Sequence, residues 1–187
     1  LVCPADLQDA SAVDGLFAAI ESECGRLDVL FNNAGTFTPG LPIEELTLTQ
    51  WTQAVSTNLT APFLCTQHAF RIMKAQSPQG GRIINIASIG AHSVLPGLTI
   101  YCMTKAAVAM MTRSLGKEWA RHQINVNAMC PGFIETELNS EWFSTEGGQK
   151  QIKSWPRRRL GVEEDLDGTL LLLASDHVFA QSQAHCS

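Results

Sequence analysis

The stretch RIINIASIGAHSVLPGLTIYCMTK, residues 82–105, passes from an apolar strand pattern through a loop into the start of a helix. Residues 82–87 are mostly apolar and rich in isoleucine, which predicts a short buried strand ending at Ser88. A helical period of apolar residues then runs from about 99 to 121. Tyr101 and Lys105 stand four positions apart in that helix, so we expect them to lie on one face.

The Tyr101–Lys105 pair has a chemical use if the two side chains are close. Tyr101 is the only tyrosine of the chain. A free phenol has a pKa of about 10, and a nearby ammonium lowers that pKa because it favours the phenolate. A phenol with a pKa nearer neutrality is a good general acid or base. The loop after Ser88 can bring the serine hydroxyl to the same point, where both hydroxyls would polarise a carbonyl oxygen. Taken alone, the pair is also compatible with a chance spacing on a solvated helix.

The rest of the chain alternates between short apolar strand patterns and amphipathic helical patterns. Strands are expected at residues 1–3, 27–31, 82–87 and 124–129, and helices at about 11–24, 47–74, 99–121 and 163–175. This alternation predicts one α/β domain with a doubly wound parallel sheet and helices on both faces. Pro62 should kink the second helix and leave the carbonyl of Asn58 without its usual donor. Residues 133–160 are expected to be irregular and polar.

Three of the predicted strands are followed by polar residues or by a proline–glycine pair. Asn32-Asn33 follows the second strand, Ser88 the third and Pro131-Gly132 the fourth. Ligands of parallel sheets bind beyond the carboxyl ends of the strands. We therefore expect these motifs to share one ligand site.

Composition excludes several classes of protein. The net charge of −5 over 187 residues offers no basic field for nucleic acid or an anionic membrane, and no apolar run reaches transmembrane length. The six cysteines are scattered without paired spacing, and the five histidines lack the spacing of metal ligands. We expect a cytoplasmic protein that binds neither nucleic acid nor membrane and holds no metal.

The order of the motifs resembles that of a classical short-chain dehydrogenase/reductase, whose fold is Rossmann-like. The matching pieces are Ala5-Asp6-Leu7, Asn32-Asn33-Ala34-Gly35, Asn58, Ser88, Tyr101-x-x-x-Lys105 and Pro131-Gly132-Phe133-Ile134-Glu135-Thr136. The resemblance runs from the first residue to about Asp176. Several motifs in a fixed order are far more specific than any one of them.

The resemblance implies a catalytic set of four residues. Tyr101 would be the acid in reduction and the base in oxidation. Lys105 would lower the pKa of Tyr101 and hold the ribose hydroxyls of a nicotinamide cofactor. Ser88 would orient the substrate oxygen, and Asn58 would hold a water that links Lys105 to solvent.

The resemblance also implies that NAD or NADP is the cofactor. The residues implied to bind it are Asp6, Leu7, Asn32, Ala34, Gly35, Tyr101, Lys105, Pro131, Gly132, Ile134 and Thr136. Asp6 would contact the adenine, Asn32 and Gly35 would back the adenosine side, and Ile134 and Thr136 would lie near the carboxamide. From the residues alone, Asn32-Asn33 is equally a turn pair, and Asp6 a turn or capping residue.

The function that follows from the resemblance is hydride transfer between NAD(P)(H) and a ketone or secondary alcohol, by a protein expected to be a homo-oligomer. One alternative is a catalytically inactive truncated chain or a nucleotide-sensing relative. Another is an epimerase or dehydratase that recycles its cofactor. The pattern is similar to 3-oxoacyl-carrier-protein reductases and to sugar or polyol dehydrogenases, and residue chemistry does not separate the two.

The chain departs from the family pattern at both ends. The glycine-rich turn that receives the pyrophosphate is not in the sequence, so the first βαβα segment of the family fold would precede Leu1. The residue that selects NAD or NADP would also precede Leu1. We expect the last strand of the family fold to be lacking as well. We therefore expect a single, partial domain that by itself binds the cofactor poorly and exposes apolar surface.

Overall fold

The fold is described from a computed structural model of the chain, which places residues 1–37, 40–137 and 139–176. A parallel sheet contains three strands, β1 (Val29–Asn32), β2 (Gly81–Ile86) and β3 (Ile124–Met129), in the order β1-β2-β3. The register places Asn32 opposite Asn85, and Asn85 opposite Ala128. All three strands therefore end at one edge, as the strand patterns predicted.

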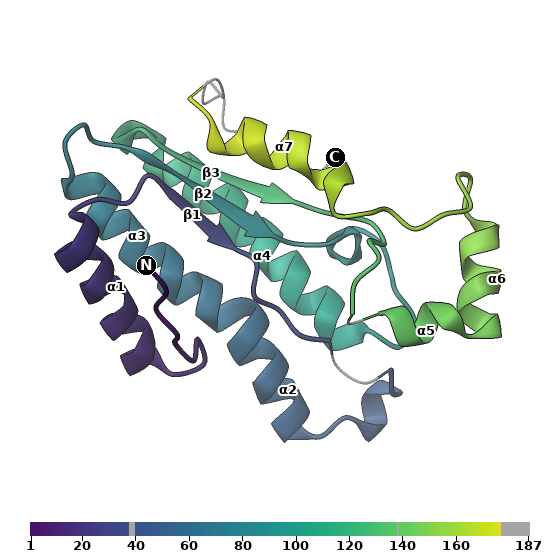
Figure 1. The fold of residues 1–187 in the computed structure, drawn as a ribbon. Helices are drawn as coiled ribbons and strands as arrows, with labels where there is room; N and C mark the ends of the chain where they lie inside the picture. Colours follow the sequence, from purple (N-terminus) through teal and green to yellow (C-terminus); the bar gives the residue numbers. More distant parts are fainter. Residues whose placement is uncertain (38–39, 138, 177–187) are drawn as a thin grey trace.

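Helices cover both faces of this sheet, so the predicted doubly wound α/β architecture is confirmed. On one face lie α1 (Ala10–Cys24), α3 (Ala61–Ala75) and α4 (Thr99–Trp119), while α7 (Glu164–Ala174) lies on the other, next to β2 (Figure 1). The main core fills the space between α1, α3 and the sheet. It is formed by Val13, Phe17, Cys65, Ala69, Ile72, Met73, Ile83, Ile124 and Val126.

Side-chain caps and a glycine mark the ends of the first two helices. The Asp9 side chain caps α1 by accepting from Ser11 N, and Gly25 ends the helix in the left-handed region at φ 67°. Thr47 and Gln50 form a capping box at the start of α2 (Leu48–Val55). These side chains satisfy backbone N–H groups that the first helical turn leaves without partners.

The expected kink near Pro62 takes the form of a π-helical segment, Ser56–Thr60, between α2 and α3. There the N–H of Ala61 bonds to the carbonyl of Ser56, five residues earlier. Pro62 has no N–H to give the Asn58 carbonyl, so the regular α-helical ladder is interrupted at this point. The interruption directs the Asn58 side chain inward, where it is 1% exposed.

Two expectations about secondary structure are wrong. Residues 1–3 form no strand, and Leu1 and Val2 are 84% and 89% exposed, because β1 is the edge strand of the described sheet and no neighbouring strand receives them. The region 133–160 contains α5 (Ser140–Ser144) and α6 (Glu146–Ser154). Thr145 caps α6. This helix contains two glycines, Gly147 and Gly148, which weakened the helical pattern in the sequence.

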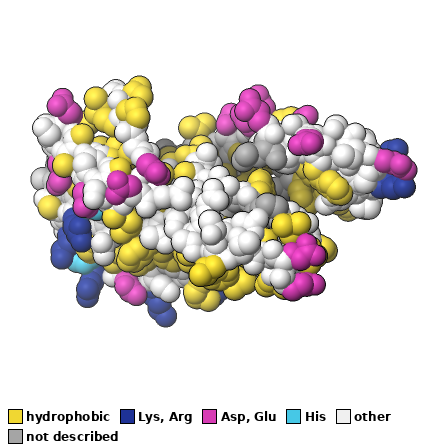
Figure 2. Space-filling model, turned by 90° about the horizontal axis from the view of Figure 1, so that it is seen from below, with side chains coloured by type: hydrophobic (Ala, Val, Ile, Leu, Met, Phe, Trp, Pro, Cys, Tyr) yellow, Lys and Arg dark blue, Asp and Glu magenta, His cyan; other side chains and the backbone are white. Residues whose placement is uncertain are grey.

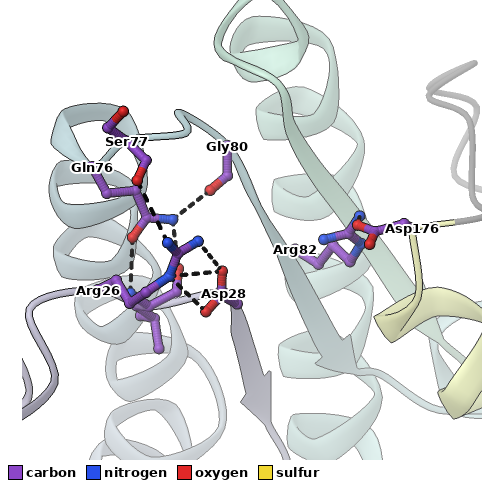
Figure 3. A network of polar contacts seen from close by, with 8 residues as sticks. Arg26, Asp28, Gln76, Ser77, Gly80, Arg82 and Asp176 are labelled. Carbon is purple, nitrogen blue, oxygen red and sulfur yellow. Dashed lines mark hydrogen bonds and ion pairs between the residues drawn. The ribbon is translucent and has the colours of Figure 1, made fainter.

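A network of polar contacts fixes the turns at the amino ends of the strands (Figure 3). The Gln76 amide bonds to both backbone groups of Leu27 and donates to the Gly80 carbonyl at 2.7 Å. Arg26 bonds to both carboxylate oxygens of Asp28. At the other side of β2, Arg82 donates to the Ser175 carbonyl at 2.6 Å and pairs with Asp176, which ties the end of α7 to the sheet. No helix within the described ranges is both long and apolar enough to cross a bilayer.

We expect the turn before β2 to depend on Gly80. Its φ is +123°, and a Cβ would stand 2.6 Å from the Gln123 carbonyl oxygen, so Gly80→Ala should destabilise the fold by about 1–3 kcal/mol. Gly15→Ala on α1 is the matched control, because nothing lies within 4 Å of its Cβ position. That change should stabilise by about 0.5–1 kcal/mol. Urea midpoints that shift in the same direction for both variants would contradict this account.

Candidate active site

Ser88 and Tyr101 meet at the carboxyl edge of the sheet. Ser88 follows β2 and caps the 3-10 segment Ile89–Ala91 by accepting from Gly90 N at 3.0 Å, while Tyr101 is the third residue of α4. The Ser88 hydroxyl lies close enough to the Tyr101 phenol to favour its ionised form. Both side chains line a cavity of about 470 Å³, which we call the first cavity. The juxtaposition expected from the sequence is therefore present.

Lys105 lies one turn further along α4 and is almost completely buried, with 4% exposed. Its Nζ donates to the Ile86 carbonyl at 2.7 Å and stands 5.7 Å from the centre of the Tyr101 ring. Burial lowers the pKa of Lys105 to about 8, and the nearby Cys130 side chain acts in the opposite direction. The amine is therefore poised to exchange a proton near neutral pH.

The expected lowering of the Tyr101 pKa is wrong for this structure. Burial raises the pKa of Tyr101 above its ordinary value, and the nearby Ser88 hydroxyl opposes that rise without cancelling it. Lys105 is not among the groups that lower the pKa, since its amine lies over the ring and bonds to Ile86. Phe37 stacks on the Tyr101 ring at 4.7 Å and contributes to its burial.

Asn58 connects the loop after β1 to α4. Its Oδ1 accepts from Thr36 N at 2.7 Å, and its Nδ2 donates to the Thr36 carbonyl at 2.8 Å. The same nitrogen lies 3.4 Å from Thr104 Oγ1, next to Lys105 in the chain. The amide group is thus used within the protein, so a water held by Asn58 would have to bond to its backbone carbonyl.

Asn32 belongs to a buried polar ladder and does not line the first cavity. Its Nδ2 donates to Asn85 Oδ1 at 2.8 Å and to Thr66 Oγ1 at 3.0 Å, and Asn85 Nδ2 donates to Thr112 Oγ1 at 2.9 Å. The ladder joins β1 and β2 to α3 and α4. Asn33, in contrast, lines the first cavity beside Ser88 and Tyr101.

The other predicted cofactor residues divide into two groups. Four line the first cavity after β3, namely Pro131, Gly132, Ile134 and Thr136. Asp6, Leu7, Ala34 and Gly35 do not line it. The Asp6 side chain accepts from Gln8 N at 2.9 Å, as the turn interpretation predicted, while Leu7 packs against the main core. Leu7 and Ala34 line a separate cleft of about 220 Å³.

Some residues around the first cavity were not identified from the sequence. Phe37 lies in a loop whose sequence pattern did not indicate its contacts. Residues from a distant part of the chain also reach the cavity, namely Glu163, which precedes α7, and Leu166, Asp167 and Leu170 of α7. Only the apolar period of α7 could have indicated that one of its faces packs inward. Within the described ranges, no group of His, Cys, Asp and Glu is placed to hold a metal ion.

We expect ultraviolet titration to report Tyr101 directly, because these 187 residues contain no other tyrosine. The midpoint of ionisation should lie above the ordinary phenol value of about 10. Ser88→Ala should raise it further, because the hydroxyl that favours the phenolate is lost. Ser93→Ala, in the exposed part of the same loop, should leave it unchanged. A midpoint below 10 would show that burial is not the dominant cause.

Lys105 should make stability depend on pH. Between pH 8 and the ordinary lysine pKa of 10.5, the unfolded chain binds more protons than the folded chain, so the free energy of unfolding rises with pH. Lys105→Met cannot titrate. Its stability relative to the parent should therefore fall by about 3 kcal/mol between pH 7 and pH 10.5. Lys117 is exposed on the same helix, so Lys117→Met should show little of this pH dependence. The free energy of unfolding is measured in urea at each pH. An equal pH dependence for the two variants would refute the burial of Lys105.

The geometry of this edge can be compared with known proteins. A family model described as Enoyl-(Acyl carrier protein) reductase matches residues 1–182. The chain is 35% identical to a gluconate 5-dehydrogenase of Gluconobacter oxydans over 172 residues, which cover 91% of this chain and 66% of that protein. It is 34% identical to a 3-oxoacyl-[acyl-carrier-protein] reductase of Synechocystis, over 92% of this chain and 67% of the relative. The chain thus spans about two thirds of the length of these relatives.

Solved structures agree with these relatives. A gluconate 5-dehydrogenase from Burkholderia cenocepacia, in complex with NADP and tartrate, superposes with a TM-score of 0.85 at 32% identity, over 91% of this chain and 66% of that one. A putative short-chain alcohol dehydrogenase from Sinorhizobium meliloti gives a TM-score of 0.84 at 35% identity, over 92% of this chain and 68% of that one. With the fold, the Ser88–Tyr101–Lys105 arrangement and these matches in agreement, the chain belongs to the short-chain dehydrogenase/reductase family.

Proposed function

We propose that the protein containing this chain transfers a hydride between NAD(P)(H) and a ketone or secondary alcohol. The observation that carries the proposal is the meeting of the Ser88 and Tyr101 hydroxyls beside the buried Lys105 amine, at the edge where parallel sheets bind ligands. The names of the relatives, dehydrogenases and reductases, support it. The same three side chains weigh against a nucleotide-sensing relative, which has no need of them.

The residues at this edge fit a nicotinamide cofactor. Lys105 gives one of its three N–H donors to Ile86 and keeps others for a ligand. A Cβ at Gly35 would stand 3.5 Å from both Lys105 Nζ and Asn58 Oδ1, so the glycine leaves space in front of the amine. In this proposal Lys105 and Tyr101 hold the ribose. The relatives with bound NADP or NADPH support this choice of cofactor.

We propose the remaining cofactor contacts from where the other predicted residues lie in the structure. Ile134 and Thr136, with Pro131 and Gly132, would hold the carboxamide end from the far wall of the first cavity. The adenosine end would lie over the exposed Ala34-Gly35 backbone, with Asp6 and Leu7 beyond it. Asn32 would act indirectly, because its hydrogen bond to Asn85 holds the end of β1 in place.

The protein's own part in the reaction is to move a proton and to orient the carbonyl. When bound, the cofactor supplies or accepts the hydride. In reduction, Tyr101 would give its hydroxyl proton to the substrate oxygen while Ser88 donates a hydrogen bond to that oxygen. Lys105, with a pKa of about 8, would restore the proton of Tyr101 through the ribose. A water on the Asn58 carbonyl would connect Lys105 to solvent.

We also propose that the protein is a cytoplasmic homo-oligomer. Large apolar side chains are exposed on the layer of helices α2–α4, including Leu48 at 78% and Met110 at 57%. Figure 2, seen from the side of α2, shows hydrophobic side chains between the acidic and basic groups. A second copy would bury them. The cysteines in the described ranges form no disulfide with one another, as a reducing compartment favours.

Replacing Tyr101 tests the proposed activity. Tyr101→Phe removes the proton donor and keeps the ring that stacks on Phe37, so turnover should fall by roughly 10²–10⁴-fold. Binding of NADPH, followed by fluorescence, should weaken by about tenfold at most, because Lys105 still holds the ribose. The neighbouring Cys102→Ala serves as the control and should keep activity. A Tyr101→Phe variant that oxidises NADPH with carbonyl substrates at the parent rate would rule out the proposed role.

A further inference from the structure

A second cavity adjoins the first and is lined almost entirely by apolar side chains. Its volume is also about 470 Å³, within the range of small-molecule sites. The two cavities share Phe37, Leu95, Leu98, Phe133 and Asn139. Since Phe37 lines both cavities and stacks on the Tyr101 ring, the second cavity begins next to the site.

The walls of the second cavity come from segments that are distant in sequence. Phe133 and Phe143 belong to an aromatic group with Trp155, whose ring centres are 4.7–6.0 Å apart. Trp142, on α5, lines the cavity and is 53% exposed. On the opposite side, Gly97 approaches the Gly40 backbone closely enough that a Cβ would stand 3.6 Å from Gly40 Cα.

Most polar side-chain atoms along this lining already have protein partners. Asn139 donates to the Ile134 carbonyl at 2.7 Å and accepts from Thr136 N at 3.0 Å. Gln151 accepts from the Trp142 indole at 2.9 Å. A ligand with many hydroxyls would therefore lose its hydrogen bonds to water without gaining matching side-chain partners here. That loss would make its binding free energy less favourable.

Charge around the two cavities disfavours an anionic substrate. Within the described part of the chain, no Lys or Arg lines either cavity, whereas Glu163 and Asp167 line the first. Residues 157–159 are all arginines, and Arg159, the one nearest to α7 in sequence, is paired with Asp165 at 2.9 Å. A substrate carboxylate would thus face acidic side chains and no guanidinium or ammonium along the lining.

We infer that the substrate carries an apolar group, an alkyl chain or an aromatic ring, which occupies the second cavity next to the carbonyl. The inference rests on the proposed function and narrows it. It favours an acyl-type or aromatic ketone over the sugar acids and polyols named for some relatives. Trp142, Phe133 and Leu95 would be the residues that determine this specificity.

The test is a series of methyl ketones from butanone to octanone, reduced with NADPH or NADH, with ketogluconate as the hydrophilic comparison. We expect kcat/KM to rise about threefold with each added methylene, and ketogluconate to be a poor substrate. Trp142→Ala should flatten that rise, with a loss of roughly tenfold for octanone and little change for butanone. Trp51→Ala on α2, also a partly exposed tryptophan away from both cavities, should keep the parent slope.

Calorimetric titration with octanone in the presence of NADP⁺ measures binding without turnover. Binding that Trp142→Ala weakens and Trp51→Ala does not would support the inference. A flat ketone series, a preference for ketogluconate, or octanone binding that ignores Trp142 would overturn it while leaving hydride transfer intact. If no carbonyl is reduced and octanone still binds in a Trp142-dependent way, the proposed function fails and the assignment of the cavity to apolar ligands stands.

Discussion

One hydrogen bond, from Lys105 Nζ to the Ile86 carbonyl, joins the middle of the site to the sheet. Because the amine is buried, it needs an acceptor inside the protein, and the last residue of β2 provides one. The bond holds α4 against the carboxyl end of β2. Tyr101, one helical turn earlier, is thereby placed against Ser88, which follows the same strand.

The buried polar groups around this bond form a connected frame. The Asn32–Asn85–Thr112 ladder fixes β1 and β2 relative to α4, and the π-helical segment brings Asn58 against Thr36 and Thr104. Each of these groups would be costly to bury without its partner, so the frame favours one arrangement of strands and helices. The apolar second cavity lies outside this frame, between loops and short helices.

The burial that creates the site also changes its acid–base properties. Removal from water raises the pKa of Tyr101 and lowers that of Lys105, so both groups are pushed toward their neutral forms. Because the pKa of Lys105 then lies below that of Tyr101, the ammonium gives its proton readily to a tyrosinate, whereas transfer from the phenol to the neutral amine is unfavourable. Spacing on a helix suggested that the amine charge would act on the phenol, whereas in the fold the amine points toward Ile86 and desolvation dominates.

The sequence by itself determined the three strands β1, β2 and β3, the main helices and the residues that follow each of these strands. Those features depend on local patterns and on the rule that parallel strands share one carboxyl edge. Pro62 interrupted its helix as expected for the same reason, since a proline acts on backbone groups within a few residues. Only the tertiary structure decided that Asn32 turns inward to Asn85, that residues 1–3 form no strand, and that α7 and the aromatic residues near α5 enclose the cavities. Those features arise from contacts between segments tens of residues apart, where burial and the pairing of polar groups, and not local propensity, select the arrangement.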